Sequence, residues 1–172
     1  MTLHRTIRTR PRQGLAIAEV VTSALVSELL DPSPEFWLVS GWVSDITVID
    51  NSHGDFDHLL EGRSGAWTLA AVLALLQRRG TTLRVALRDI PHNMAFVERL
   101  ARQLNDAPFA YYKSPDLHEK LMCGRDWQLS GSMNFTWNGL ERNEEAVEYR
   151  VDEVAAAHQR VELHQRWIGV AI

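Results

Sequence analysis

The fold is decided by residues 117–145, which read LHEKLMCGRDWQLSGSMNFTWNGLERNEE. Residues 117–123 and 127–130 are rich in apolar side chains and have the length of short strands. The triplet GRD at 124–126 separates them and has the residue types of a tight turn. This stretch therefore predicts a β-hairpin, and the polar residues on both sides of it become candidates for a functional site.

Strands and helices alternate in the rest of the chain. Apolar side chains recur at helical spacing in some stretches, and short runs of branched and aromatic residues lie between them. The expected order is a helix at 15–30, a strand at 36–43, a polar loop at 45–65, a helix at 66–79, a strand at 82–87, a helix from Asn93, a strand at 108–112, the hairpin, a strand at 145–151 and a helix at 153–167. This order predicts an α/β fold, with a mixed and mostly parallel sheet flanked by helices on both faces and one hairpin that carries the polar motif.

Length and composition indicate one globular domain. The chain has 172 residues, of which 45% are hydrophobic and 23% charged, and we expect a single domain over residues 13–172. Residues 1–12 hold four arginines and no acidic residue, and are expected to form a flexible basic arm. The net charge of −4 argues against a protein that coats nucleic acid or anionic membranes indiscriminately. The single cysteine, Cys123, cannot form an internal disulfide, so a cytoplasmic location is expected.

Four polar side chains suit phosphate chemistry. Side chains two residues apart in a strand point the same way, so His118 and Lys120 are expected on one face, roughly 7 Å apart at their bases. Ser132 and Asn134 repeat this spacing after the hairpin. An imidazole can attack phosphorus or protonate a leaving oxygen, while an ammonium and an amide hold the other phosphate oxygens. Each pair alone is typical of a polar sheet face, but together they predict a phosphate site.

The order of these residues resembles the HKD motif of the phospholipase D superfamily, in particular its short bacterial nucleases with one motif per chain. The resemblance rests on His118-x-Lys120, on residues 131–136 (GSMNFT) and on residues 143–145 (NEE). A narrower likeness, to phospholipase D-like proteins of bacterial anti-phage and DNA-modification gene clusters, rests on residues 131–139 (GSMNFTWNG) and on the Ser-Asp-Ile segment at 44–46.

The resemblance implies a metal-independent phosphodiesterase without a cofactor, which acts on DNA or RNA. His118 would attack the phosphodiester to form a phosphohistidine, and a second His118 would protonate the leaving oxygen and then activate water. Because the chain has one such motif, the second histidine must come from a homodimer with a twofold axis through the site. Lipid hydrolysis is less favoured, since lipid-acting relatives carry two motifs in a longer chain.

The resemblance also assigns roles to the other motif residues. Lys120 and Asn134 would hold phosphoryl oxygens, and Ser132 would orient the phosphate. Glu145 would accept a hydrogen bond from the other ring nitrogen of His118, and Glu144 is the alternative if the register slips by one residue.

One position departs from the family pattern. The pattern has an aspartate five residues after the lysine, where this chain has Arg125, and Asp126 follows one residue later. Asp126 is therefore a candidate for the displaced structural aspartate. Arg63, Arg125 and Trp137 are the residues that we expect to contact substrate, and Arg63 lies in a Gly-rich turn, residues 62–65, before an expected helix.

Two alternatives remain open. The polar loop contains histidines and aspartates whose spacing would suit a divalent metal in a metal-dependent nuclease: Asp50, His53, Asp55, Asp57 and His58. A solvated loop is the favoured interpretation, because no expected strand or helix fixes the geometry of these side chains. The displaced aspartate favours a second alternative. In this alternative, the chain forms a dimer that binds nucleic acid as a scaffold and is catalytically weak or inactive. It would act with other proteins of a bacterial defence or DNA-modification system.

Overall fold

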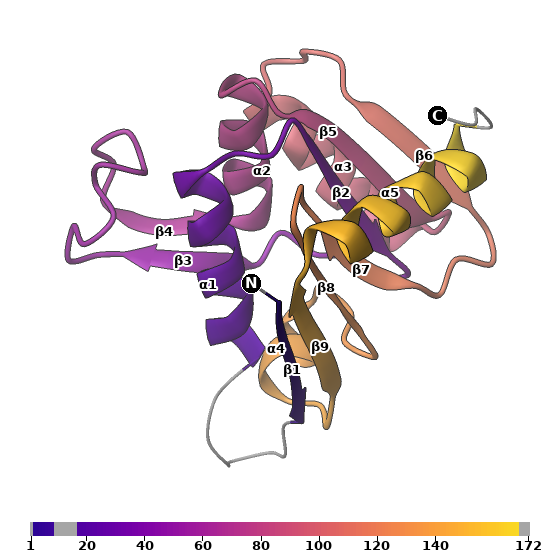
Figure 1. The fold of residues 1–172 in the computed structure, drawn as a ribbon. Helices are drawn as coiled ribbons and strands as arrows, with labels where there is room; N and C mark the ends of the chain where they lie inside the picture. The colour runs from indigo at the N-terminus through magenta and orange to yellow at the C-terminus, as the bar shows by residue number, and fades with distance from the viewer. Residues whose placement is uncertain (1, 9–16, 169–172) are drawn as a thin grey trace.

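A seven-stranded mixed sheet forms the centre of the molecule (Figure 1). The computed structural model describes residues 2–8 and 17–168. The elements are β1 (Leu3–Arg8), α1 (Ile17–Leu30), β2 (Glu35–Ser40), β3 (Thr47–Asn51), β4 (Gly65–Thr68), α2 (Leu69–Arg78), β5 (Thr82–Arg88), α3 (Pro91–Gln103), β6 (Ala110–Ser114), β7 (Lys120–Cys123), β8 (Trp127–Gly131), α4 (Trp137–Glu141), β9 (Ala146–Val151) and α5 (Glu153–Trp167). The strand order in the sheet is β1-β9-β8-β7-β2-β5-β6.

The α/β class, the mixed sheet and the hairpin are confirmed, but parallel pairing is less extensive than expected. β2, β5 and β6 pair in parallel, and α2 and α3 connect them. From β2 across β7, β8 and β9 to β1, each neighbouring pair is antiparallel. The sequence pattern overestimated the parallel part because it gave no strand at β1 and did not show that β7 pairs antiparallel with β2.

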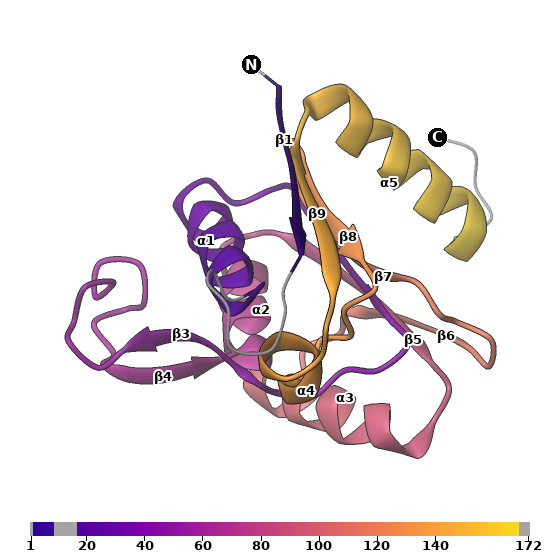
Figure 2. The ribbon, with the colours of Figure 1, turned by 90° about the horizontal axis from the view of Figure 1, so that it is seen from below.

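The two faces of the sheet bury different side chains. Along β2, Phe36 and Leu38 pack into the larger core under α1, α2 and α3, whereas Trp37 and Val39 face the smaller core under α5. Figure 2 shows α5 on one side of β7, β8 and β9 and α1 on the other. Because helices cover β2 from both sides, its side chains are apolar on both faces, which explains the run of apolar residues in this part of the sequence.

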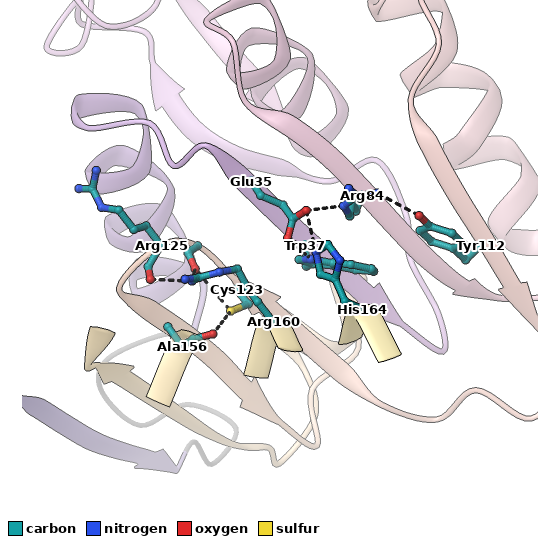
Figure 3. A network of polar contacts seen from close by, with 10 residues as sticks. Glu35, Trp37, Arg84, Tyr112, Cys123, Arg125, Ala156, Arg160 and His164 are labelled. Atoms are coloured by element: carbon teal, nitrogen blue, oxygen red, sulfur yellow. Dashed lines mark hydrogen bonds and ion pairs between the residues drawn. The ribbon is translucent and has the colours of Figure 1, made fainter. Parts of the chain in front are cut away.

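Polar contacts attach α5 to the sheet (Figure 3). The Glu35 carboxylate of β2 accepts hydrogen bonds from Arg84 of β5, from the Trp37 indole at 2.8 Å and from His164 of α5 at 2.8 and 2.9 Å. Arg84 also donates to the Tyr112 hydroxyl at 3.1 Å. These hydrogen bonds outweigh burial and lower the pKa of Glu35. The network fixes the position of α5 over the sheet.

The segment expected to be a long loop, residues 45–65, contains regular structure. β3 and β4 form a separate two-stranded antiparallel sheet that projects from the rest of the molecule (Figure 1). Asn51, which is fully buried, donates to Asp57 and to the Arg63 carbonyl and accepts from the Phe56 backbone, so one side chain organises the connecting turn. β3 escaped the sequence analysis because it is short and lies among polar residues. Residues 66–68 of β4 were expected to begin the helix at 66–79, but that helix, α2, begins at Leu69 after the Thr68 N-cap.

The segment expected to be a flexible arm, residues 1–12, is in part a strand. Leu3–Arg8 form β1, which pairs with all of β9 at the edge of the sheet. Its exposed, charged side chains hid the strand in the sequence, because edge strands need little apolar surface. Arg10 and Arg12 lie outside the described residues. No helix in the part of the chain that the structure describes is long and apolar enough to cross a membrane.

Candidate active site

The candidate active site lies at one edge of the sheet, where the ends of β2, β7, β8 and β9 meet. Lys120, the first residue of β7, pairs with Ser40, the last residue of β2. Gly131, the last residue of β8, pairs with Val147 near the start of β9. This register brings the sequence-predicted residues to one edge from segments on both sides of the hairpin: His118, Lys120, Ser132, Asn134 and Glu145.

His118 and Lys120 differ in their surroundings. β7 begins only at Lys120, so the strand alternation expected for this pair does not extend to His118, which lies in the preceding irregular segment. The His118 side chain is exposed, whereas Lys120 is 6% exposed and its Nζ donates to the His118 carbonyl. Burial lowers the pKa of Lys120, and the negative charge of Glu145 opposes that change. A shielded ammonium thus lies directly beneath the histidine backbone.

Ser132 and Glu145 are directly connected. The Ser132 hydroxyl donates to Glu145 and accepts from the Ala146 backbone N–H at 3.0 Å. The other carboxylate oxygen of Glu145 accepts from the Asn143 amide at 3.1 Å. Within residues 2–8 and 17–168, Glu145 makes no hydrogen bond to the His118 ring, so the orienting contact implied by the family resemblance is absent from this single chain. Glu144, the alternative, is exposed.

Asn134 and the backbone of His118 approach each other across Gly41. A Cβ placed on Gly41 would lie 3.1 Å from the Leu117 carbonyl oxygen, 3.6 Å from His118 Cα and 3.7 Å from Asn134 Oδ1. Asn134 Oδ1 is shielded from solvent and has no hydrogen-bond partner among the described residues. A glycine after β2 therefore lets the amide and the histidine segment pack closely, and the amide retains an unused acceptor.

The opposite end of the hairpin holds Arg125 and Asp126, so the structure does not bring them to this edge. Arg125 forms an ion pair with Asp31, and its backbone N–H donates to Ser33 Oγ at 2.7 Å. The Asp126 carbonyl accepts from the Asp152 backbone N–H at 2.7 Å. Arg125 is thus not placed to contact a substrate at His118, and Asp126 occupies a structural turn.

Polar side chains from both faces of the sheet hold this turn. Glu28 of α1 is 2% exposed and accepts from the Ser33 backbone at 2.7 Å and from the Trp127 indole at 2.7 Å. Burial raises the pKa of Glu28. From α5, Arg160 donates to the carbonyls of Gly124 and Arg125 at 2.5 and 2.6 Å.

Cys123 also lies near the turn, in β7, and has a packing role. Burial raises the pKa of its thiol to about 12, so it remains protonated near neutral pH.

The two remaining candidates for substrate contact lie in different places. Arg63 is in the β3–β4 turn, 5.1 Å from the centre of the Trp67 ring, and belongs to the projecting hairpin. Trp137, the first residue of α4, is 54% exposed and follows the Asn134 segment closely. Trp137 shares a surface hollow with the motif residue Asn134.

That hollow has a volume of about 450 Å³ and contains residues that the sequence analysis did not single out. Its lining includes Asn134 and Trp137 from the motif region, and Trp42 and His92 from the segments that follow β2 and β5. No signal in the sequence pointed to Trp42, because residues 36–43 were expected to form one strand, whereas β2 ends at Ser40 and Trp42 is 41% exposed. The sequence also could not show that His92 lies beside Trp42, because the two residues are 50 positions apart in the chain.

The histidines and aspartates of the β3–β4 region do not gather around a common point. Asp50 accepts from Ser52, and Asp57 accepts from Asn51. Among the residues that the structure describes, no three His, Cys, Asp or Glu side chains are grouped so that they could hold a metal ion. The alternative of a divalent-metal site in this loop therefore has no structural support among the described residues.

Chemically, this edge combines an imidazole with groups that can stabilise negative charge. His118 is exposed, and the ammonium of Lys120 is held at the His118 backbone carbonyl. A positive charge and an amide beside a nucleophile suit the charge that develops on phosphate oxygens during phosphoryl transfer.

No protein-family model and no curated protein sequence matches this chain. Solved structures do match it. Nuc from Salmonella typhimurium, a phospholipase D family member, superposes with a TM-score of 0.65 at 11% identity, covering 96% of this chain and 93% of Nuc. NucT from Helicobacter pylori matches with a TM-score of 0.57 at 11% identity, covering 100% of this chain and 99% of NucT.

A third match differs in its described role. The archaeal chromatin protein TrmBL2, whose structure shows a novel mode of DNA binding, has a TM-score of 0.56 at 8% identity, with 95% of this chain and 51% of TrmBL2 covered. At such low sequence identity, these structural matches establish the architecture alone, and the chemistry has to be argued from the residues of the site. The chain therefore has the fold of the phospholipase D family.

Proposed function

We propose that this chain is a phosphodiesterase that cleaves DNA or RNA without a metal ion, through a phosphohistidine on His118. The observation that carries the proposal is the gathering of an exposed imidazole, a buried ammonium and a closely packed amide at one sheet edge. The chain shares its fold with Nuc, a phospholipase D family member, which agrees with the family resemblance of the motif residues.

The proposed reaction has two steps. A ring nitrogen of His118 attacks phosphorus, and the P–N bond forms as the P–O bond to the leaving group breaks. The leaving oxygen takes a proton from the partner subunit's His118. That deprotonated imidazole then removes a proton from water, whose oxygen attacks phosphorus and releases His118. Lys120 and Asn134 stabilise the phosphoryl oxygens, and Ser132 orients the phosphate.

The reaction requires a homodimer, because one chain carries a single His-x-Lys pair. The exposed position of His118 at a sheet edge supports this requirement, since a second copy can approach it. In such a dimer, a carboxylate of either subunit is available to orient the imidazole, which Glu145 does not contact within one chain.

The test is cleavage of a nucleic acid and of a bis-aryl phosphodiester in the presence of EDTA. We expect turnover by the wild type and none by His118→Ala, with an unchanged circular dichroism spectrum, because the side chain is exposed. Trapping of a phosphorylated His118 during turnover would identify the intermediate. A strict requirement for added metal, or a native mass of one chain during turnover, would contradict the proposal.

A second candidate function is nucleic-acid binding without turnover, within a bacterial defence or DNA-modification system. Two observations favour it: Asp126 lies at the far turn, and Glu145 is bound by Ser132 and Asn143 instead of His118. The fold shared with TrmBL2 is compatible with DNA binding. Equal nucleic-acid affinity of the wild type and His118→Ala, with no cleavage by either, would support this candidate.

A further inference from the structure

The six tryptophans of the chain all lie within the described residues, and two of them differ from the rest. Trp37, Trp67 and Trp127 are buried, and Trp167 packs at the edge of the smaller core. Trp42 and Trp137 are 41% and 54% exposed. Both line the 450 Å³ hollow beside Asn134, although they are 95 positions apart in the chain. Two large aromatic surfaces are thus exposed to solvent beside the candidate active site.

A buried side chain holds the segment that presents Trp42. Asn93, at the start of α3, is fully buried and accepts a hydrogen bond from the Val43 backbone at 2.9 Å. Its amide donates to the Gly41 carbonyl at 3.0 Å, so both backbone neighbours of Trp42 are fixed by one residue. The Trp42 carbonyl itself accepts from Ser40 at 2.6 Å. The exposure of Trp42 is therefore set by a rigid, buried framework.

Cationic or polar groups flank both tryptophans. The Trp42 and His92 rings lie 5.2 Å apart, and His92 Nε2 is 3.0 Å from Ser44 Oγ. The Arg142 guanidinium lies 4.7 Å from the centre of the Trp137 ring and forms no ion pair with another described residue. Cation–π contact with Arg142 restrains the Trp137 ring and places a positive charge next to it.

The hollow also differs in charge from the acidic chain as a whole. Among the described residues that line it, none carries a carboxylate, and the polar ones are amides, hydroxyls and an imidazole. The net charge of the chain is −4, so a polyanion meets less repulsion here than the overall charge indicates. Aromatic faces, neutral hydrogen-bonding groups and an adjacent cation are the features of a surface that binds nucleobases and phosphates together.

We propose that Trp42 and Trp137 stack against unpaired nucleobases next to the scissile phosphate, so that the substrate is single-stranded nucleic acid. This inference rests on the proposed function and specifies its substrate class. Bases in a duplex are stacked on each other and offer only their edges, whereas unpaired bases offer a whole face to an aromatic ring. Arg142 contacts a phosphate of the strand beside Trp137.

The experiment measures binding by fluorescence anisotropy in the His118→Ala background, where no cleavage occurs. Three labelled probes of equal length are compared: an oligothymidylate, the same backbone without bases, and a blunt duplex. We expect the oligothymidylate to bind tightest. Trp42→Ala and Trp137→Ala should each weaken its binding about tenfold, which corresponds to about 1.4 kcal/mol, and leave the abasic probe unchanged.

Matched variants separate stacking from other effects. Trp137→Phe retains an aromatic face and should recover part of the lost affinity, while Val154→Ala, an exposed position on α5, should change no probe. Equal losses for the abasic and base-containing probes would overturn the proposal, as would a preference for the duplex or no measurable binding. A change of native mass in either tryptophan variant would assign these rings to a subunit interface and overturn it as well.

The proposed function is tested separately by cleavage of the bis-aryl ester. If the parent chain cleaves this ester through His118 but binds the abasic probe as tightly as the oligothymidylate, the stacking proposal alone fails. If no ester is cleaved while base-dependent binding persists, the catalytic proposal fails and the tryptophans remain a binding site.

Discussion

The two ends of the β7–β8 hairpin are stabilised very differently. At the turn, Glu28 from one face accepts hydrogen bonds from Ser33 and Trp127, and Arg160 from the other face donates to the turn carbonyls, so these polar groups are paired. At the open end, His118 is exposed and Asn134 Oδ1 lacks a partner among the described residues. Buried polar groups are normally satisfied, so the contrast separates a part that maintains the fold from a part that is available for chemistry.

This contrast explains why two cations on the same hairpin have different roles. Lys120 lies at the open end and is buried beside the motif residues, whereas Arg125 lies at the turn in an exposed ion pair with Asp31. The two residues are close in the sequence, so both were expected in the candidate site. β7 lies between them and carries the chain from the open end to the turn, so they lie at opposite ends of the hairpin. Their replacement by an uncharged side chain of similar length tests the comparison directly.

The largest effect is expected for Lys120→Met. Loss of a preorganised positive charge at a phosphoryl group should lower kcat by a factor on the order of 10² to 10³. Stability should not fall, because a buried cation is costly to maintain. The matched Arg125→Met variant should keep its activity and lose less than about 1 kcal/mol, as expected for an exposed ion pair. Similar kcat losses in both variants would remove the distinction between the two ends.

At the turn, Glu28→Ala should lower stability and leave the activity of the folded protein nearly unchanged. Removal of this carboxylate leaves the Ser33 backbone and the Trp127 indole without their acceptor in a buried place. We expect the free energy of unfolding to fall by about 2 to 4 kcal/mol, measured by denaturant titration. Activity per folded molecule should remain within about twofold of wild type. A specific loss of kcat without destabilisation would show that the turn takes part in catalysis.

A smaller effect is expected for Gly41→Ala at the open end. The new methyl group would lie 3.1 Å from the Leu117 carbonyl, so the segment that carries His118 must shift by a few tenths of an ångström. We expect kcat to fall about tenfold with a change in stability below about 1 kcal/mol, since misplacement of a nucleophile costs rate before it costs folding. Val154→Ala, at an exposed position on α5, serves as the control.

The smallest effect concerns the pH dependence of stability. The folded-state pKa of Glu35 is lower than its ordinary value of 4.5, so its stabilising contribution is present above that value and is lost as the pH falls through the folded pKa. Glu35→Gln should therefore reduce the loss of stability as the pH falls below 4.5, measured by thermal unfolding. Glu28, whose pKa is raised, contributes in the opposite sense: stability is lost as the pH rises above 4.5. An unchanged acid limb in Glu35→Gln would exclude this assignment.

Much of the fold was predictable from the spacing of apolar residues. The helices α2, α3 and α5 and the strands β5 and β8 lie where periodicity places them, because they bury one clear face or a continuous apolar run. β1, β3 and β4 were missed for a common reason. Each pairs with one partner strand and is short or exposed: β1 buries no side chain, and β3 and β4 have five and four residues, too few for a clear alternation of apolar and polar side chains.

The site was predictable only where its residues are close in the chain. His118, Lys120, Ser132, Asn134 and Glu145 flank one hairpin, and the hairpin register brings them to one edge. The contributions of Trp42 and Asn93 depend on the parallel pairing of β2 with β5, which no local pattern encodes. Arg63 illustrates the converse, since a plausible phosphate-binding turn belongs to the separate β3–β4 sheet.

The pairing of β1 with β9 has a consequence for biosynthesis. β1 leaves the ribosome long before its partner, which is the last strand of the sheet to be made. Until β9 has been made, β1 has no partner. The nascent chain therefore carries an unpaired strand with three basic or potentially basic side chains, His4, Arg5 and Arg8. A chain shortened by its first eight residues would leave β9 as a bare edge, open to intermolecular strand pairing and aggregation.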